Sequence, residues 1–294
     1  MKVLAFGEVV WDVIEEEFHL GGAPINFAAH SIQCGNDSAI ISALGFDELG
    51  DEALELIEKM GVDVSLIQKN NRQTGLVPVT LKNGQPIYEI LNNVAFDFIG
   101  LKDIDLLKVQ EYDVFYFGTL IQRNKQSRET LFQILDTFQF EDVFYDVNLR
   151  KDTFTIEAIR NSLLHCTILK VNDEELHWIG KKLFGEAQDF DSFCEKIVNQ
   201  FPGIKTIIIT VGEKGSFVYS ENYLHKIPTK KEAVKDAVGA GDAYSAAFLS
   251  VYFKTGDVLQ AASLGNQIAG YVATSSGAIP VYSNHIKNLM NKYM

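Results

Sequence analysis

The chain has 294 residues, of which 47% are hydrophobic and 22% are charged, so it is long enough to bury a full core. Its net charge of −13 argues against nucleic acid or an anionic membrane as a partner. The three cysteines are widely spaced, the histidines lack a metal-binding spacing, and no apolar run approaches the ~20 residues of a membrane span. We therefore expect a cytoplasmic protein with no disulfide framework and no histidine-based metal site.

The first part of the chain combines short apolar strands with helices. Apolar residues at 3–7 and 9–14 predict two strands, and Asp12 lies toward the end of the second one. Gly21-Gly22-Ala23-Pro24 predicts the start of a helix, because proline is favoured in the first helical turn. The next expected elements are a core strand at 39–43 and a helix at 51–60.

Residues 74–90 follow a different pattern, in which apolar and polar positions alternate on both sides of Asn83-Gly84. Alternation about an Asn-Gly pair predicts a β-hairpin. We interpret this hairpin as an antiparallel flap standing off the main sheet. A small lid is expected from segments at approximately 10–20 and 73–98, and the acidic run at 15–17 is interpreted as a solvated edge.

From residue 112 onward, apolar strands alternate regularly with helices. Strands are predicted at 114–118, 143–147, 167–171 and 205–210, and helices at 127–137, 155–164 and 173–183. Such alternation with continuously apolar strands indicates an α/β fold whose mostly parallel, doubly wound sheet has helices on both faces. We expect a single domain over residues 1–294, with the lid segments inserted in it.

Polar residues gather where these predicted strands end. Successive strands are followed by Asp146, Asn148 and Arg150, by Asn172 and Glu175, and by Thr210, Gly212 and Gly215. Ligands of parallel sheets bind at the carboxyl ends of the strands, so these clusters indicate one functional edge. Helix capping is the alternative interpretation of Asn172.

The stretch Asp236-Ala237-Val238-Gly239-Ala240-Gly241-Asp242 precedes an apolar run with the composition of a helix. The two glycines allow a ligand to approach closely, and the first turn of a helix offers an anion unpaired N–H groups and the positive end of the dipole. Asp242 would lie beside that anion, where it could accept the proton of an attacking hydroxyl. An ordinary helix cap after a glycine turn is the alternative for this motif taken alone.

These motifs, in this order, resemble the ribokinase family of carbohydrate kinases, also called the phosphofructokinase-B family, over nearly the whole chain. Residues 236–244 are similar to its C-terminal signature and residues 21–28 to its N-terminal one. Other similar segments are 146–150, 172–175, 210–216 and 277–280. The resemblance implies a ribokinase-like α/β fold with a small β-sheet lid, ATP as the phosphoryl donor and a sugar hydroxyl as the acceptor.

The resemblance also implies roles for individual residues. Asp242 would be the general base, and the N–H groups of Gly239, Ala240, Gly241 and Asp242 would form an anion hole. The substrate would be bound by Asp12, Gly22, Asn26 and Arg150, although Arg150 could instead brace the loop through Asp146. The nucleotide would be bound by Asn172, Thr210, Gly212, Gly215 and Asn266. Glu175 would hold Mg²⁺ through water, and Asp236 would belong to a monovalent-cation site for K⁺.

The segments expected to face the sugar favour a neutral acceptor. Ala23-Pro24 stands where ribokinases and sugar-phosphate kinases have Lys-Gly, and Lys82 is the only lysine or arginine in residues 9–30 and 75–98. A phosphate or carboxylate would need a stronger cationic clamp. The Gly-Gly-Ala-Pro motif is most similar to fructokinases, so fructose is the expected sugar.

Other interpretations stay open. Tyr88, Phe96 and Phe98 could stack on a base, as in a nucleoside kinase. A 2-keto-3-deoxygluconate-type kinase and a non-catalytic regulator that binds a sugar or nucleotide are further alternatives. The lid hairpin could also pair with a second copy and give a homodimer.

Overall fold

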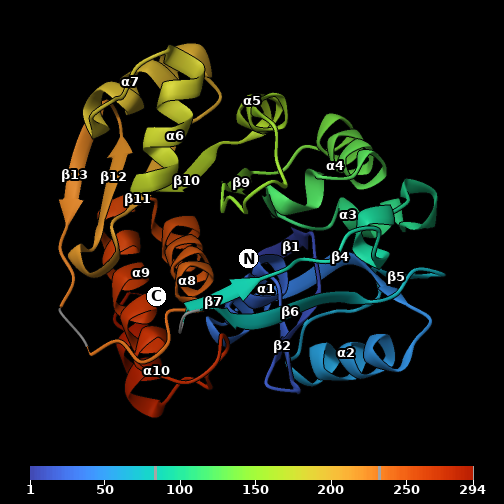
Figure 1. Ribbon diagram of the computed structural model, residues 1–294. Helices are drawn as coiled ribbons and strands as arrows, with labels where there is room; N and C mark the ends of the chain where they lie inside the picture. The colour runs from blue at the N-terminus through green and yellow to red at the C-terminus, as the bar shows by residue number, and fades with distance from the viewer. Residues whose placement is uncertain (83–84, 231–232, 294) are drawn as a thin grey trace.

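A nine-stranded sheet forms the centre of the molecule in a computed structural model that describes residues 1–82, 85–230 and 233–293 (Figure 1). The strand order is β13-β12-β11-β10-β9-β8-β1-β4-β5. In chain order the bounds are β1 Lys2–Phe6, β4 Asp37–Gly45, β5 Ile67–Asn70, β8 Val114–Gly118, β9 Asp142–Asp146, β10 Ile168–Asn172, β11 Thr206–Thr210, β12 Ser216–Ser220 and β13 Tyr223–Ile227. Neighbouring strands from β5 to β11 are parallel, whereas β12 and β13 add an antiparallel edge, so the predicted mostly parallel sheet is confirmed.

Helices cover both faces of this sheet, because the strands are apolar on both sides. Along β1, Leu4 and Phe6 enter one buried cluster, whereas Val3 and Ala5 enter the other. One cluster includes residues of α3 Leu106–Val109, α4 Lys125–Thr137, α5 Ile156–His165, α6 Asp173–Phe184 and α7 Phe190–Gln200. The other includes residues of α1 Ala23–Gln33, α2 Glu48–Lys59, α8 Ala240–Thr255, α9 Val258–Ala273 and α10 Asn284–Met290. Within the described part of the chain, no helix combines the length and hydropathy needed to cross a membrane.

A second sheet of four strands, ordered β3-β2-β6-β7, lies beside the first (Figure 1). Its strands are β2 Val10–Ile14, β3 Glu17–Gly21, β6 Gly75–Lys82 and β7 Gln85–Tyr88. The predicted antiparallel hairpin is confirmed as β6 and β7, and the sheet as a whole is mixed, since β2 pairs with β6 in parallel. The acidic run is a turn at Glu15 and Glu16 that leads into β3, which the sequence did not predict.

The strands of the small sheet end at Tyr88 and do not extend to residue 98, where the lid segment was expected to end. Ala95–Phe98 forms the 3-10 helix η1, which packs against β4 of the large sheet, and Phe96 is fully buried in the core. The guanidinium of Arg123 lies 4.7 Å from the centre of the Phe96 ring. Phe96 is thus unsuited to stack on a ligand from a lid. The turn at Asn83-Gly84 lies outside the described residues, and so does the side chain of Tyr88.

Candidate active site

The turn before α8 has the geometry of an anion site. Gly239 has φ 77°, and a Cβ placed there would lie 2.3 Å from the carbonyl oxygen of Ala278, so only glycine fits. The N–H of Ala240 donates to Ala237 at 3.3 Å, whereas the N–H groups of Gly239, Gly241 and Asp242 have no partner among the described residues. These three donors, at the positive end of a 16-residue helix, are available to a phosphate.

Asp242, in the first turn of α8, is a buried carboxylate with one hydrogen-bond donor. Its side chain accepts from Nδ2 of Asn26 at 2.9 Å, and the residue is 8% exposed. Burial raises the pKa of Asp242 to about 7, and the charge of Asp146 adds to this rise, while the bond from Asn26 and the charges of Lys170 and Arg150 oppose it. A carboxyl with such a pKa is well matched to general-base work near neutral pH.

Helix α1 brings two more of the predicted residues to this place. Gly22 caps the helix with φ 117°, and a Cβ there would lie 2.5 Å from the carbonyl oxygen of Glu8. One turn later, Asn26 points at Asp242, which is 216 residues away in the sequence. Helices α1 and α8 pack against each other, and this contact joins the two signature motifs.

Asp12 and Arg150 belong to the same charged cluster. Asp12 lies on β2 of the small sheet, and a Cβ at Gly21 would lie 2.9 Å from its Oδ2. Burial raises the pKa of Asp12, and the charges of Arg150 and His19 lower it. The charge of Arg150 also lowers the pKa of Glu8 and Asp242, so this cation acts on three acids.

Asn172 and Glu175 form a capping box at the start of α6. Asn172 Oδ1 accepts from the N–H of Glu175, and Glu175 Oε2 accepts from the N–H of Asn172, both at 2.8 Å. Glu175 Oε1 accepts from Leu149 at 2.7 Å, which fixes the loop after β9. Burial raises the pKa of Glu175. The capping alternative therefore describes both side chains, and it leaves the amide nitrogen of Asn172 for a ligand.

The other predicted nucleotide residues lie around the end of β11 and β13. Thr210 pairs with Asn172 across adjacent strands, and Gly212 begins the 3-10 helix that follows β11. Asn266 on α9 donates to the carbonyl oxygen of Ile227 at 3.0 Å, and a Cβ at Gly215 would lie 2.3 Å from that same oxygen.

Asp236 stabilises the turn itself. Its Oδ1 accepts from the N–H of Val238 at 3.0 Å, and its Oδ2 accepts from that of Gly277 at 3.2 Å. Among the described residues, no group of three or more His, Cys, Asp or Glu side chains is arranged to hold a metal ion. A cation beside Asp236 would therefore also need backbone carbonyls or ligand oxygens.

Sequence reasoning missed two buried ionisable residues at this edge. Glu8 follows β1, burial raises its pKa to about 7, and its Oε2 has no hydrogen-bond partner among the described residues. Lys170, in the middle of β10, lies 2.7 Å from Asp146 Oδ2. For Lys170, the only signal in the sequence was a lysine inside the apolar run 167–171.

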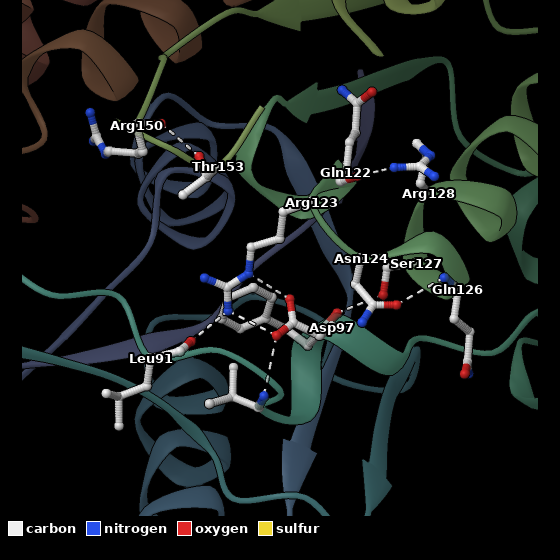
Figure 2. A network of polar contacts seen from close by, with 12 residues as sticks. Leu91, Asp97, Gln122, Arg123, Asn124, Gln126, Ser127, Arg128, Arg150 and Thr153 are labelled. Atoms are coloured by element: carbon white, nitrogen blue, oxygen red, sulfur yellow. Dashed lines mark hydrogen bonds and ion pairs between the residues drawn. The ribbon is translucent and has the colours of Figure 1, made fainter. Parts of the chain in front are cut away.

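A polar cavity of about 490 Å³ is lined by Asp97, Arg123 and Thr155 among others, and none of the predicted site residues lines it. Arg123 borders it and makes a two-pronged bond with Asp97, at 2.7 and 2.8 Å, and a third bond with the carbonyl of Leu91 (Figure 2). Figure 2 shows the guanidinium of Arg150 pointing away from Arg123. Arg123 therefore has Asp97 as its counter-charge, and Arg150 and Lys170 are the cations that act on Asp242.

A mostly parallel α/β sheet with a small second sheet, and a buried carboxylate beside unpaired amides, define a phosphotransferase that acts on an alcohol group. The pfkB family carbohydrate kinase profile matches residues 2–284, so the chain belongs to this family. The sequence-based assignment is confirmed.

Individual relatives agree with this assignment. The chain is 28% identical to the sugar kinase PH1459 of Pyrococcus horikoshii, over 99% of this chain and 95% of the relative. It is 26% identical to fructokinase-2 of Zea mays, over 95% and 90%. The structure of a Xylella fastidiosa fructokinase with bound ATP has a TM-score of 0.88 at 18% identity, covering 99% of this chain and 98% of that one, and it supports the fold alone.

Proposed function

We propose that this protein transfers the γ-phosphate of ATP to a hydroxyl of a small neutral sugar, with fructose as the best candidate. The observation that carries the proposal is the buried Asp242, held by Asn26 and next to the unpaired amides of the α8 turn. The Pyrococcus horikoshii sugar kinase, which is 27% identical over 94% of this chain, has a structure in complex with ATP. The Zea mays relative is named a fructokinase.

In the proposed reaction, Asp242 accepts the proton of the sugar hydroxyl while the oxygen of that hydroxyl attacks the γ-phosphorus of ATP. The new oxygen–phosphorus bond forms as the bond to the bridging oxygen breaks, and ADP leaves. The N–H groups of Gly239, Gly241 and Asp242 donate to the phosphoryl oxygens as charge develops on them. Asp12, Gly22, Asn26 and Arg150 would hold the sugar so that its hydroxyl meets Asp242.

Mg²⁺ would supply charge neutralisation on the phosphates when bound. Glu175 suits a role through water, because each of its oxygens already accepts one backbone N–H and keeps a free lone pair. Thr210, Gly212, Gly215 and Asn266 are proposed to line the nucleotide. Asp236 is proposed to contribute to a K⁺ site. A Vibrio cholerae fructokinase of similar fold, at 20% identity, has a structure with bound fructose, ADP and potassium ion.

The charges around the acceptor end support a neutral sugar. Arg123 forms an ion pair with Asp97, and Arg150 is a cation whose charge lowers the pKa of both Glu8 and Asp12. An acidic sugar would add negative charge to a site that already has more acids than bases. Burial of Phe96 removes one of the aromatic residues that a nucleoside kinase would use. Two alternatives keep support of fold only, from structures of a 2-dehydro-3-deoxygluconokinase and an aminoimidazole riboside kinase, each at 21% identity.

The test is ADP release with ATP and a panel of fructose, other neutral sugars, 2-keto-3-deoxygluconate and nucleosides. We expect the highest kcat/KM with fructose, rising with pH through about 7 as Asp242 loses its proton. Asp242→Asn should lower kcat by about 10²- to 10⁴-fold, the usual contribution of a general base. A wild-type protein that binds sugars or nucleosides yet releases no ADP with any of them would refute the kinase proposal and favour a binding regulator.

A further inference from the structure

Lys170 occupies a position that an apolar residue would normally fill. It is the central residue of β10, whose first four residues are buried, and its side chain is only 8% exposed. Its ammonium forms an ion pair with Asp146, whose side chain is 4% exposed. Burying two charges costs desolvation free energy that a well-packed apolar pair would not cost. Stability therefore does not account for the pair.

The pair lies directly behind the anion-binding turn. A Cβ built on Gly241 would be 3.4 Å from Nζ of Lys170, so the ammonium reaches the backbone of the turn. Ser245, one helical turn further along α8, places Oγ 3.2 Å from Asp146 Oδ2 and 3.0 Å from the carbonyl oxygen of Gly241. Tyr116 on β8 donates to the same carboxylate oxygen at 3.2 Å. Two strands and a helix thus hold the ammonium against the turn.

We propose that Lys170 is a positioning residue of the phosphoryl-transfer centre, which places a fixed positive charge behind Gly241 and thereby acts on both the incoming phosphate and the base Asp242. The inference rests on the proposed kinase function. Asp146 is the counter-charge that holds the ammonium in place, and Ser245 links that counter-charge to the turn. In a dry site, a fixed charge needs no reorganisation when negative charge develops on the phosphoryl group.

The two members of the pair should act on Asp242 in opposite directions. The groups that face Asp242 are Asn26 on α1, Tyr116 on β8, Asp146 on β9, Arg150 in the loop after β9 and Lys170 on β10. Asp146 raises the pKa of Asp242, whereas Lys170 lowers it. Loss of the lysine charge should therefore raise that pKa, and loss of the aspartate charge should lower it. A merely structural pair would not give shifts of opposite sign.

The experiment compares Lys170→Met, Lys170→Arg and Asp146→Asn with the wild type in two measurements. The first is the pH dependence of kcat/KM, whose acid limb should move to higher pH in Lys170→Met and to lower pH in Asp146→Asn. We also expect Lys170→Met to lower kcat about tenfold or more with little change in the KM of the sugar, and Lys170→Arg to recover much of it. The second is a carbon-13 titration of the Asp242 carboxyl, assigned with Asp242→Asn, which needs no turnover.

Tyr116→Phe is the matched control, because it removes one hydrogen bond to Asp146 and no charge. Its shift should be smaller than those of the charge variants. Equal shifts in Tyr116→Phe and Lys170→Met, or shifts of one sign in both charge variants with the fold intact by circular dichroism, would overturn the proposal. These outcomes differ from failure of the kinase proposal, in which the wild type itself would release no ADP.

Discussion

Asp242 and Asp12 are both candidate site carboxylates, but they lie in opposite kinds of surroundings. Asp242 is buried at the start of α8, accepts a hydrogen bond from Asn26 and has a buried ion pair nearby. Asp12 lies on the small sheet, and the groups that lower the pKa of its carboxyl are the charges of Arg150 and His19, with no hydrogen bond among them. Close to it in the same sheet, Ile14 is 41% exposed and Phe18 is 48% exposed.

The surroundings of Asp242 are already ordered without a ligand, whereas those of Asp12 offer hydrogen-bonding groups that a ligand would satisfy. The proposed phosphoryl-transfer end is fixed by helices and strands of the large sheet, which is the preorganisation that charge stabilisation requires. The acceptor end has open hydrogen-bonding capacity on a small sheet, so sugar binding there should order it and exclude water. Changes at the first end should therefore lower kcat, and changes at the second should raise the KM of the sugar.

After Asp242→Asn, the largest effect is expected from Gly239→Ala. The left-handed backbone and the contact of 2.3 Å with the Ala278 carbonyl would force the turn to move, which misplaces the amide donors. We expect kcat to fall by about 10²- to 10³-fold, the usual cost of a lost oxyanion donor. Gly256→Ala is the control, because Gly256 also has a left-handed φ of 69° but an added Cβ would meet no atom within 4 Å. Steady-state kinetics of both variants decide the point, and equal losses of kcat would contradict the prediction.

Asp12→Ala tests the open end. The proposed hydrogen bonds from sugar hydroxyls to this carboxylate should be lost, and the KM of the sugar should rise about tenfold to hundredfold, as for bonds to a charged group. The KM of ATP should stay nearly constant. Asp12→Asn should show a smaller rise, because the amide oxygen still accepts. Equal rises in both KM values would place Asp12 outside the sugar site.

The sequence predicted the parts of the site that depend on local chemistry. The glycine turn at 236–242, the start of a helix at Gly22 and the strand–helix alternation all follow from residues a few positions apart. Lys170 and Asp146 could not be paired in advance, because their contact depends on the register between β9 and β10. Phe96 was misplaced for the same reason, since its partner Arg123 lies on a distant segment.

Glu8 is buried and its Oε2 has no hydrogen-bond partner among the described residues, and Glu8→Gln tests how this burial affects stability. Its pKa is raised from 4.5 to about 7 in the folded protein, so the folded state holds this proton more tightly than the unfolded chain. The resulting stability is fully present below pH 4.5 and is lost as the pH rises through about 7. Glutamine cannot ionise, so the variant should gain stability relative to the wild type between pH 5 and pH 8, on the order of 1–3 kcal/mol.

Thermal unfolding of both proteins at the two pH values measures this gain. The control is Glu55→Gln on α2, because the same substitution at this exposed residue removes no buried carboxyl. If Glu8→Gln differs from the wild type by the same amount at pH 5 and at pH 8, Glu8 is not the buried, protonated group described here.

The smallest effect is expected at the outer edge of the small sheet, where we propose that a second copy packs. Strand β3 pairs with β2 alone among the described strands, and its residues Glu17 to His19 are exposed, so its free edge and Phe18 could join the same surface of another molecule. Sedimentation velocity should show a mass that rises with concentration, and Phe18→Asp should weaken this association.

Leu164→Asp is the control, because Leu164 is 61% exposed on α5, a helix that packs on the nine-stranded sheet and not on the small sheet. A single monomeric species at every concentration would contradict dimer formation, and association that survives Phe18→Asp would assign it to another surface. Either result would leave sugar binding, and not a partner copy, as the event that completes the open end of the site.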